Sequence, residues 1–395
     1  MTTRPQTANI PLSVPELRGN EWKYVKDCLD TGWVSAVGAY VRRFEQMIAA
    51  QVGLASAVAT NSGTSALHIA LLVSGVQPED EVLVSTLTFI APVNAIRYVG
   101  AWPVLIDAEP HYWQLDSAKV REFLISNCHE SGDVVRNRRT GRRVKAILPV
   151  HILGHPVDMD PILEIAGEMG LAVIEDATEC LGAKYRGRKV GTLGDIACLS
   201  FNGNKIITTG GGGAVVTSNP AWAARAKYLT TQAKDNETEF IHGEIGYNYR
   251  LTNIQAALGC AQVELLSDYI EKKKMIASRY EAALSGVPGI TLMPEAPWAE
   301  SIFWLYTILI DRERFGMDSR SVLRELAKKG IQTRPLWQPM HRSPVHKDCE
   351  GFRCEVADSL NLRALSLPCS VGLSEPDQNY VIKALLSLTT QSTRL

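Results

Sequence analysis

The stretch that decides the fold reads Asp195-Ile-Ala-Cys-Leu-Ser-Phe-Asn-Gly-Asn-Lys205-Ile-Ile-Thr-Thr-Gly-Gly-Gly-Gly213-Ala-Val-Val-Thr217. The apolar segments 196–201 and 214–217 predict two buried strands, and a lysine and a run of glycines lie between them. Glycine lets the backbone approach a ligand closely. An apolar setting removes water from a lysine ammonium, which favours the neutral, nucleophilic amine of a Schiff-base lysine. The alternative is a surface lysine in a glycine-rich turn, so other segments must decide.

The composition is that of an ordinary soluble enzyme. The 395 residues are 46% hydrophobic and 21% charged, and this length suits one large domain and a smaller one. The formal net charge of −1 implies no general affinity for nucleic acid or anionic membranes. The cysteines form no C-x-x-C pair, which predicts neither a metal site nor a disulfide framework. The polar N-terminus and the lack of a long apolar run predict a cytoplasmic protein.

Apolar segments and helical patterns alternate along the first half of the chain. This alternation predicts an α/β fold whose mostly parallel, doubly wound sheet is covered by helices on both faces. A polar, arginine-rich insert at 126–143 predicts a surface hairpin. The expected strands are 55–60, 81–87, 103–107, 144–151 and 171–176, and the expected helices are 15–30, 41–49, 65–72, 91–99, 117–124 and 161–169.

Polar residues follow the predicted strands at the sheet edge where ligands bind in such folds. They should face one cleft, and they are Thr88, Phe89, His151, Asp176, Glu179 and the run from Ser200 to Lys205. The turn Asn61-Ser-Gly-Thr64 begins a helix, whose free N–H groups and dipole can cradle a phosphate together with two hydroxyls. Either Ser62 or Thr64 can equally be an ordinary helix cap.

Asp176 ends the apolar run 171–176. A carboxylate at the end of a buried strand is costly unless it is paired. A protonated pyridine nitrogen is a suitable partner, and pyridoxal phosphate needs such a carboxylate to act as an electron sink. The alternative is a cap for a helix that begins at Ala177, but Lys205 further along the chain favours the cofactor role.

The remainder of the chain predicts a second, smaller domain. A long helix at 251–284 precedes short strands and helices at 303–310, 319–328, 331–334, 354–362 and 376–388. We therefore expect a large cofactor-binding α/β domain at residues 1–260 and a small C-terminal α+β domain at 261–395.

Five stretches occur in an order that is typical of one family. They read Thr60-Asn-Ser-Gly-Thr-Ser-Ala-Leu67, Thr88-Phe-Ile-Ala-Pro-Val-Asn-Ala95, Glu175-Asp-Ala-Thr-Glu-Cys-Leu-Gly182, Leu199-Ser-Phe-Asn-Gly-Asn-Lys-Ile-Ile-Thr-Thr-Gly-Gly-Gly-Gly213 and Gly246-Tyr-Asn-Tyr-Arg-Leu-Thr-Asn-Ile-Gln-Ala-Ala-Leu-Gly259. From about Ile10 to its C-terminal helix, the chain resembles the DegT/DnrJ/EryC1/StrS family of nucleotide-sugar aminotransferases. The fourth stretch is most similar to the branch acting on 4-keto-6-deoxy sugars, of the bacillosamine, perosamine and legionaminic acid type. The resemblance implies a fold type I enzyme dependent on pyridoxal 5'-phosphate.

The resemblance also implies a role for each matching residue. Lys205 would form the Schiff base with the cofactor and move the proton, and Asp176 would pair with the pyridinium nitrogen. Asn248 would reach the phosphate from the partner subunit, so the active unit would be a homodimer, although an ordinary turn residue is the alternative. The other cofactor contacts would be Phe89 on the ring, Glu179 near the ring oxygen, Gly63, Thr64 and Ser200 on the phosphate, and Asn202. Gly211 departs from the family, which commonly has Glu there.

The implied reaction is a two-stage amino transfer. L-Glutamate would donate its amino group to the cofactor and leave as 2-oxoglutarate, and the cofactor would then aminate the keto carbon of a nucleotide-linked sugar. The candidates for substrate contacts are Arg334, Trp337 and His341, each of which can equally be a packing residue, and Trp33, although a tryptophan in such a loop more often packs against a helix. A sugar dehydrase of this family would have His in place of Lys205, and a non-catalytic relative would be expected to lose Lys205 or Asp176. A dinucleotide site is disfavoured, because the glycine run precedes a strand and not a helix.

Overall fold

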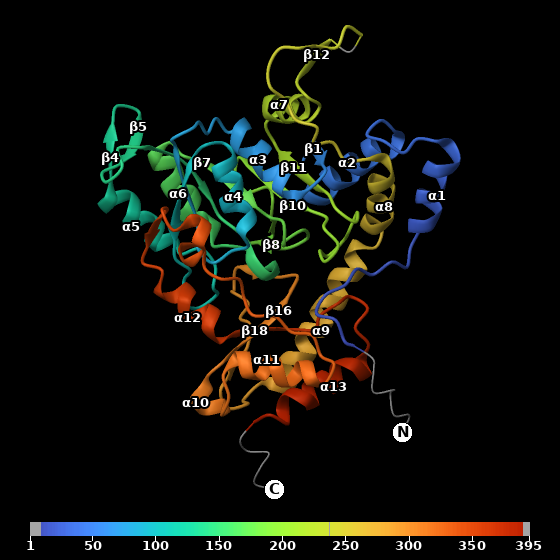
Figure 1. Ribbon diagram of the computed structural model, residues 1–395, viewed down its shortest axis with the longest axis vertical. Helices are drawn as coiled ribbons and strands as arrows, with labels where there is room; N and C mark the ends of the chain where they lie inside the picture. The colour runs from blue at the N-terminus through green and yellow to red at the C-terminus, as the bar shows by residue number, and fades with distance from the viewer. Residues whose placement is uncertain (1–8, 237, 390–395) are drawn as a thin grey trace.

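The computed structural model describes residues 9–236 and 238–389, so the polar segment at the N-terminus lies almost wholly outside the described residues. A ten-stranded sheet forms the upper part of the molecule in Figure 1. Its main path pairs, in order, β1 (Ser56–Thr60), β11 (Gly213–Thr217), β10 (Ile196–Ser200), β7 (Ala172–Asp176), β6 (Arg143–Leu148), β2 (Glu81–Ser85), β3 (Trp102–Ile106) and β17 (Glu350–Phe352). The five pairs from β10 to β17 are parallel and the two at the β1 edge are antiparallel. The predicted α/β fold with a mostly parallel sheet is confirmed.

Both faces of this sheet are buried, which is why its strands read as continuous apolar runs. Successive residues divide between two hydrophobic clusters, with Val82 and Val84 in one and Leu83 in the other, because side chains alternate along a strand. Helices α3 (Gly63–Val73) and α4 (Ile90–Tyr98) contribute to the first cluster, and α5 (Ser117–Asn127) and α6 (Met159–Met169) contribute to the second. The sheet is therefore covered on both sides, as predicted.

Two predicted helices have different bounds. The expected helix at 15–30 is wrong at its start, because α1 (Glu21–Thr31) begins only after Gly19 and Asn20, and the preceding chain runs along the C-terminal part, where the Val14 N–H donates to Ser370. The expected helix at 251–284 is wrong as a single element. It divides into α8 (Asn253–Val263) and α9 (Leu266–Leu284), and non-helical backbone angles at Leu265 separate the two. The helix at 41–49 is α2 (Ala39–Val52).

The C-terminal part lies below the sheet in Figure 1 and is connected to it by α9. A three-stranded antiparallel sheet of β14 (Ile290–Thr291), β16 (Tyr306–Ile310) and β18 (Ala364–Leu367) packs there with α11 (Ser319–Lys328) and α13 (Glu375–Leu386). The short element expected at 331–334 is present only as isolated strand bridges at its two ends. The boundary near residue 260 stays a prediction, although β17 returns to the large sheet from this part of the chain.

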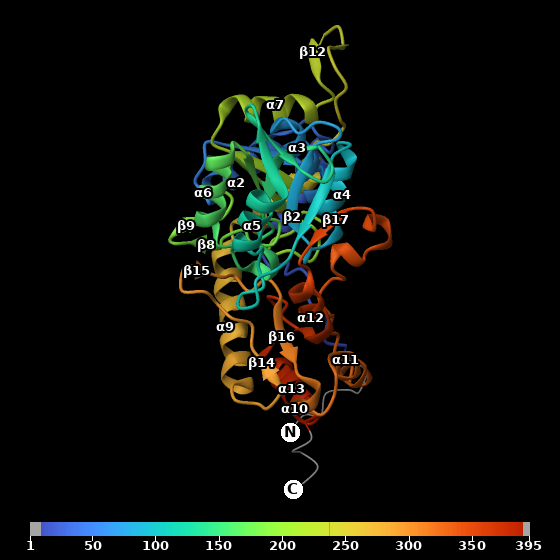
Figure 2. The ribbon, with the colours of Figure 1, turned by 90° about the vertical axis from the view of Figure 1, so that its left-hand side faces the viewer.

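Smaller elements complete the described chain. Residues 220–250 hold α7 (Pro220–Thr230) and an arm formed by β12 (Lys234–Asn236) and β13 (Ile241–His242), which stands clear of the body in both views (Figures 1 and 2). The rest are β8 (Lys184–Tyr185), β9 (Arg188–Lys189), β15 (Ala299–Glu300), α10 (Arg312–Phe315), α12 (Glu355–Arg363) and the 3-10 turns η1 (Ile152–Gly154), η2 (Met340–Arg342) and η3 (Pro344–His346). Within the described ranges, none of the helices combines the length and apolarity that a membrane crossing needs.

The insert at 126–143 forms the predicted hairpin, made of β4 (Cys128–Ser131) and β5 (Val134–Asn137). Three of its arginines pair with carboxylates: Arg139 with Glu350 and Arg142 with Glu79, each at 3.0 Å, and Arg143 with Asp80. Asn137 donates to the carboxylates of Glu81 and Glu350, at 2.9 and 2.7 Å. The hairpin is thus fastened to the edge of the sheet by polar contacts.

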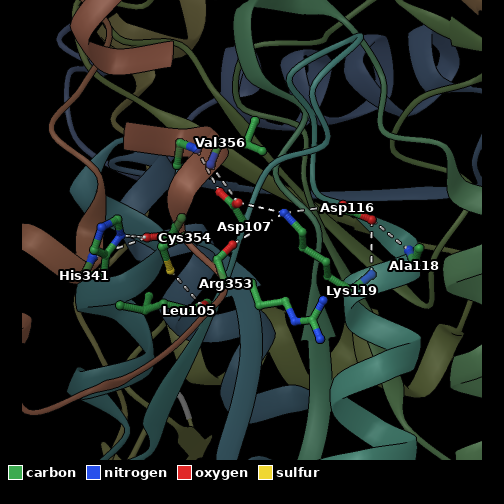
Figure 3. A network of polar contacts seen from close by, with 11 residues as sticks. Leu105, Asp107, Asp116, Ala118, Lys119, His341, Arg353, Cys354 and Val356 are labelled. Atoms are coloured by element: carbon green, nitrogen blue, oxygen red, sulfur yellow. Dashed lines mark hydrogen bonds and ion pairs between the residues drawn. The ribbon is translucent and has the colours of Figure 1, made fainter. Parts of the chain in front are cut away.

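Asp107 joins the two parts of the molecule (Figure 3). Its fully buried carboxylate accepts hydrogen bonds from the backbone N–H groups of Val356 and Ala357, at 3.0 and 2.8 Å, in the first turn of α12. Lys119 on α5 donates to the same carboxylate at 2.7 Å. A carboxylate beside a helix N-terminus satisfies free amides and the helix dipole, so Asp107 fixes the position of α12 beside the end of β3.

Candidate active site

A cavity of about 360 Å³ opens at the carboxyl ends of β7 and β10, where the strand order predicts a ligand site. The predicted cofactor residues gather around it. Its walls include Gly63, Thr64, Phe89, Asp176, Glu179, Ser200, Asn202 and Lys205, together with Ser62, Thr88, Thr178, Asn204, Trp304 and Trp337. One of the four candidates for substrate contacts, Trp337, therefore lines the same cavity.

Lys205 lies in the loop that follows β10. Its N–H donates to the carbonyl of Asn202 at 3.0 Å, which closes a turn, and its side chain is largely buried. The Nζ atom lies 3.5 Å from Oε1 of Glu179. The surface-lysine alternative is therefore wrong, and the glycine run leads into β11 rather than into a helix, so it does not form a dinucleotide site.

Asp176 is fully buried at the end of β7 and faces the cavity. Burial raises the pKa of its carboxyl, and the hydroxyl and N–H of Thr178 and the charge of Lys205 act in the opposite direction. Oδ1 accepts the Thr178 N–H at 3.1 Å. Turns follow Asp176 where the alternative requires a helix, so the helix-cap interpretation is wrong.

Glu179 is the second buried carboxyl of the cavity. Its Oε2 atom accepts the N–H of Leu153 at 2.8 Å, from a backbone whose φ of 63° is unusual for a residue other than glycine. Burial raises the pKa of Glu179 to about 7, while the neighbouring Lys205 lowers it. The carboxyl can consequently gain or lose a proton near neutral pH.

The phosphate cradle predicted at residues 61–64 is the N-terminus of α3. Ser62 is the helix cap, since its Oγ accepts the Ser65 N–H at 3.0 Å and its carbonyl accepts the Ala66 N–H. The amides of Gly63 and Thr64 precede these, at a helix end that offers them no intrahelical acceptor. A Cβ atom on Gly63 would lie 2.8 Å from Cβ of Ser200, so only glycine lets this turn approach β10.

These features fit a pyridoxal phosphate group by their chemistry. A helix N-terminus with two free amides suits a phosphate, and a buried carboxyl suits a protonated ring nitrogen. Lys205 offers an amine to the same space, and Phe89, which is 55% exposed, supplies an aromatic face.

His151 does not face the cavity, contrary to the prediction. Val150 lines the cavity, and because side chains alternate the next residue points away from it. The fully buried His151 has Nε2 at 3.1 Å from Glu175, and its Nδ1 accepts the Val157 N–H at 3.0 Å. Glu175 also accepts the N–H groups of three residues from Gly191 to Gly194, so this pair braces the strand behind Asp176.

Three of the four candidates for substrate contacts, Trp33, Arg334 and His341, and the phosphate candidate Asn248 lie outside the cavity walls. Trp33 is exposed and lines a separate hollow of about 780 Å³ with Tyr40 and Arg250. Arg334 is exposed, and its backbone pairs with Ser366. Asn248 is exposed too, and its carbonyl lies 3.4 Å from the side-chain amide of Asn61. The roles predicted for these residues stay predictions.

His341 is held between two elements near the cavity. Its Nδ1 lies 2.8 Å from the Thr86 hydroxyl and its Nε2 lies 3.1 Å from Asp358 on α12. Figure 3 shows His341 and Lys119 on opposite sides of Asp107. Nδ1 is therefore hydrogen-bonded within the protein and Nε2 lies beside a carboxylate, and a substrate role for His341 stays a prediction.

Asn204, part of the run from Ser200 to Lys205 that was expected to face the cleft, does line the cavity, whereas sequence reasoning missed Thr178 and Trp304. The signal for Thr178 was its place between two predicted site residues. Trp304 gave no such signal, because it lies in an apolar segment that reads as part of a buried strand.

The fold and the site together define a pyridoxal phosphate-dependent aminotransferase, and comparison with known proteins agrees. Residues 15–386 match the family model for the DegT/DnrJ/EryC1/StrS aminotransferase family. The chain therefore belongs to this family, whose members depend on pyridoxal phosphate.

Curated relatives and solved structures are similar along nearly the whole chain. GDP-perosamine synthase of Caulobacter vibrioides is 41% identical over 377 residues, covering 95% of this chain and 97% of the relative. GDP-perosamine synthase of Escherichia coli O157:H7 is 37% identical, with 95% and 97% covered. Aminotransferase TlmJ from Streptoalloteichus hindustanus has a TM-score of 0.86 at 26% identity, covering 96% of this chain and 99% of that one. S. venezuelae DesV has a TM-score of 0.83 at 32% identity, covering 93% of each chain.

Proposed function

We propose that this aminotransferase converts a nucleotide-linked 4-keto-6-deoxy sugar into the corresponding amino sugar, with L-glutamate as the amino donor. The observation that carries the proposal is that Lys205, Asp176 and the N-terminus of α3 open onto one cavity. A nucleotide-linked sugar substrate is supported by the relatives, which include three GDP-perosamine synthases at 34% to 41% identity and a dTDP-3-amino-3,4,6-trideoxy-alpha-D-glucose transaminase of Streptomyces venezuelae at 32%. The 4-keto-6-deoxy class rests on the resemblance of residues 199–213 to that branch. One keto oxygen of the sugar is exchanged for the amino group of glutamate, which leaves as 2-oxoglutarate.

The cofactor-binding residues follow from the cavity walls. The amides of Gly63 and Thr64 and the Ser200 hydroxyl would hold the phosphate, and Phe89 and Asn202 would flank the cofactor. Asp176 would hold the ring nitrogen in its protonated form, because a buried carboxylate is stabilised by a neighbouring positive charge. When bound, pyridoxal phosphate supplies an electron sink that stabilises negative charge at the carbon that gains or loses a proton.

Lys205 would carry the proton between the reacting atoms. Its amine is a basic group in the cavity wall, and Nζ lies 3.5 Å from Oε1 of Glu179. A general base works best when its proton affinity matches the working pH, and the carboxyl beside this amine, Glu179, has a pKa that burial raises to about 7. Trp337 and Trp304, both in the cavity wall, would limit access of water to these groups.

We also propose that the active unit is a homodimer. Phe89 is more than half exposed although it borders the cavity, and the arm of β12 and β13 stands clear of its own chain. A second copy that covers Phe89 and supplies Asn248 to the phosphate would complete the site. The cytoplasmic location expected from the sequence stays a prediction.

A panel of GDP-, UDP- and dTDP-linked keto sugars tests the proposed reaction. Each sugar is incubated with the holoenzyme and nitrogen-15 L-glutamate, and the products are identified by mass. Transfer of the labelled nitrogen to a 4-keto-6-deoxy sugar is expected. Labelling of only 3-keto sugars would contradict the sugar class, and loss of a sugar hydroxyl without transfer of nitrogen would indicate a dehydrase.

A further inference from the structure

Trp304 contacts the reactive lysine in two ways. It is 4% exposed and lies just before β16, in the C-terminal part of the molecule. The face of its indole ring covers the amine of Lys205, with Nζ 4.1 Å from the ring centroid. Its Nε1–H donates to the carbonyl of Asn204 at 2.8 Å, directly before Lys205 in the chain. One side chain thus holds both the backbone and the amine of the lysine.

The backbone of Trp304 is itself held by a second buried lysine. Lys273 on α9 is 3% exposed, and its Nζ donates to the carbonyls of Trp304 and Cys369, each at 2.5 Å. Burial lowers the pKa of Lys273. Both of these acceptors are neutral, and burying a cation without a counter-charge is costly. Packing alone would be satisfied by an apolar side chain, so the lysine at this position is explained by its two hydrogen bonds to the backbone.

A third contact fixes the same segment against the loop that holds Glu179. A Cβ atom on Gly154 would lie 2.5 Å from the Trp304 nitrogen, so the two backbones are in close contact. The N–H of Ile302 donates to the Gly154 carbonyl at 3.0 Å. Leu153, which precedes Gly154, donates to Glu179. The indole face and the carboxyl beside the Lys205 amine are therefore held by two backbone segments, 153–154 and 302–304, that contact each other.

We propose that Trp304 is a positioning residue for Lys205, and that Lys273 supports it by fixing its backbone. The inference rests on Lys205 being the reactive lysine of the proposed function. An indole face attracts an ammonium group, and a hydrogen bond from the same ring restrains the loop. Together they keep the amine directed into the cavity when it is not bonded to another group. A tryptophan that merely fills space would affect stability but not the amine.

The test measures the reactivity of the Lys205 amine in the full-length protein. Samples with the cofactor in place and after its removal are treated with limiting acetic anhydride at several pH values, and acetylation of each lysine is read by peptide mass. Lys23, an exposed lysine of α1, is the reference in every sample. The variants are Trp304→Leu, Trp304→Phe and Lys273→Met. The matched controls are Trp22→Phe, at an exposed tryptophan, and Lys274→Met, at the exposed neighbour of Lys273.

Trp304→Leu is expected to raise the acetylation rate of Lys205 in the cofactor-free protein by about three- to tenfold, because it removes both the cover and the attraction that favours the ammonium form. The curve of rate against pH should shift to lower pH. Trp304→Phe keeps a ring face and should give a smaller rise, and Lys273→Met should give a rise in the same direction. Both controls should match the wild type, and with cofactor bound Lys205 should resist acetylation in all of them.

If Lys205 in folded Trp304→Leu is acetylated at the wild-type rate, the proposal is overturned. If the leucine variant does not fold, a wild-type acetylation rate in Trp304→Phe overturns it instead. A Lys273→Met protein that melts earlier but keeps the wild-type Lys205 rate would overturn the support by Lys273. Failure of the proposed function would give a different experimental result. In that case borohydride would fix the cofactor to a lysine other than 205, whatever the acetylation rates are.

Discussion

The Nζ atom of Lys205 lies 3.5 Å from Oε1 of Glu179, and both side chains are largely enclosed. The two residues follow β10 and β7, which pair in parallel, so the carboxyl ends of these strands bring them together. Glu179 gains a nearby positive charge, but its loss of water has the larger effect on its pKa, which rises to about 7. The carboxyl therefore changes its charge in the range where the enzyme is expected to work.

The pH dependence of stability should reveal this raised pKa. A carboxyl whose pKa is higher in the folded protein than in the unfolded chain contributes stability below the unfolded pKa, and this stability is lost as the pH rises through the folded pKa. For Glu179 the pKa changes from 4.5 to about 7, so the loss falls between these values. Glu179→Gln has no such loss, and its free energy of unfolding relative to wild type should rise by about 3 kcal/mol from pH 4.5 to pH 8.

Urea unfolding of the cofactor-free protein at pH 4.5, 6 and 8 measures this difference. Glu271→Gln is the matched control, because Glu271 is an exposed residue of α9 and its replacement should give a curve parallel to that of the wild type. Parallel curves for Glu179→Gln as well would show that Glu179 keeps an ordinary pKa in the fold.

Lys205 should be the lysine that holds the cofactor. The holoenzyme is expected to be yellow, because a covalent link between a lysine amine and pyridoxal phosphate absorbs visible light. Borohydride should remove the colour and leave the reduced cofactor on the peptide that contains Lys205. Lys205→Ala should fold and bind the cofactor without a covalent link. A reduced cofactor on any other lysine would end the assignment.

The parts of the site that the sequence predicts are those that depend on local order along the chain. Asp176, Ser200 and Lys205 follow strands, and the rule that ligands lie at the carboxyl ends of parallel strands places them together. The cradle at Gly63 is predictable for the same reason, since a strand, a glycine turn and a helix follow one another in the sequence. To predict that residues far apart in the sequence meet at this site, only the order of the strands in the sheet is needed, and the alternation of strands and helices restricts that order strongly.

The errors arise where orientation or distant contacts decide. His151 was misplaced because one residue along a strand changes the face on which a side chain lies. Trp304 was missed because it reaches Lys205 from 99 positions later in the chain, and its apolar neighbours resemble any buried strand. The helix expected at 15–30 begins only at Glu21, because Gly19 is a weak helix former and interrupts the apolar spacing that precedes it.

Asp176→Asn should separate catalysis from stability. An amide cannot hold the ring nitrogen protonated, so turnover of L-glutamate should fall about a hundredfold or more, as is usual when a charge-stabilising group is lost. Burial raises the pKa of Asp176, so the buried carboxylate costs stability as the pH rises. The cofactor-free variant should therefore be at least as stable as the wild type at pH 8. Near-normal turnover would remove Asp176 from the mechanism.

Asp107 should be the main polar support of α12. Asp107→Ala leaves two helix N–H groups without their acceptor and removes the buried partner of Lys119, which keeps Asp116 and the Arg353 carbonyl nearby. Removing one partner of a buried ion pair costs about 3 to 5 kcal/mol. Asp318→Ala is the control, since Asp318 also accepts an N–H group at a helix start, from Ser321 on α11, and such a cap contributes about 1 kcal/mol. Urea unfolding compares the two variants, and equal losses would contradict the support assigned to Asp107.

A composite site shared by two subunits predicts a specific result when variants are mixed. Asn248→Ala chains keep Lys205 but should bind the cofactor weakly, and Lys205→Ala chains keep Asn248 but should be inactive. Each homodimer therefore carries a defect in both of its sites. Mixing the two proteins and allowing the subunits to exchange produces heterodimers, in which the two models of the site give different distributions of the defects.

If Asn248 acts across the interface, one site of the heterodimer combines an intact Lys205 with the partner's intact Asn248, and the other site carries both defects. Activity at limiting cofactor should then rise on mixing to about half of the wild-type value per heterodimer, because one of two independent sites is whole. If Asn248 acts within its own chain, each site keeps one defect and activity does not recover. The control is a mixture of Asn248→Ala with wild type, and mass photometry follows the exchange. Full exchange without recovery would contradict the shared site, and an active monomer in light scattering would contradict the dimer itself.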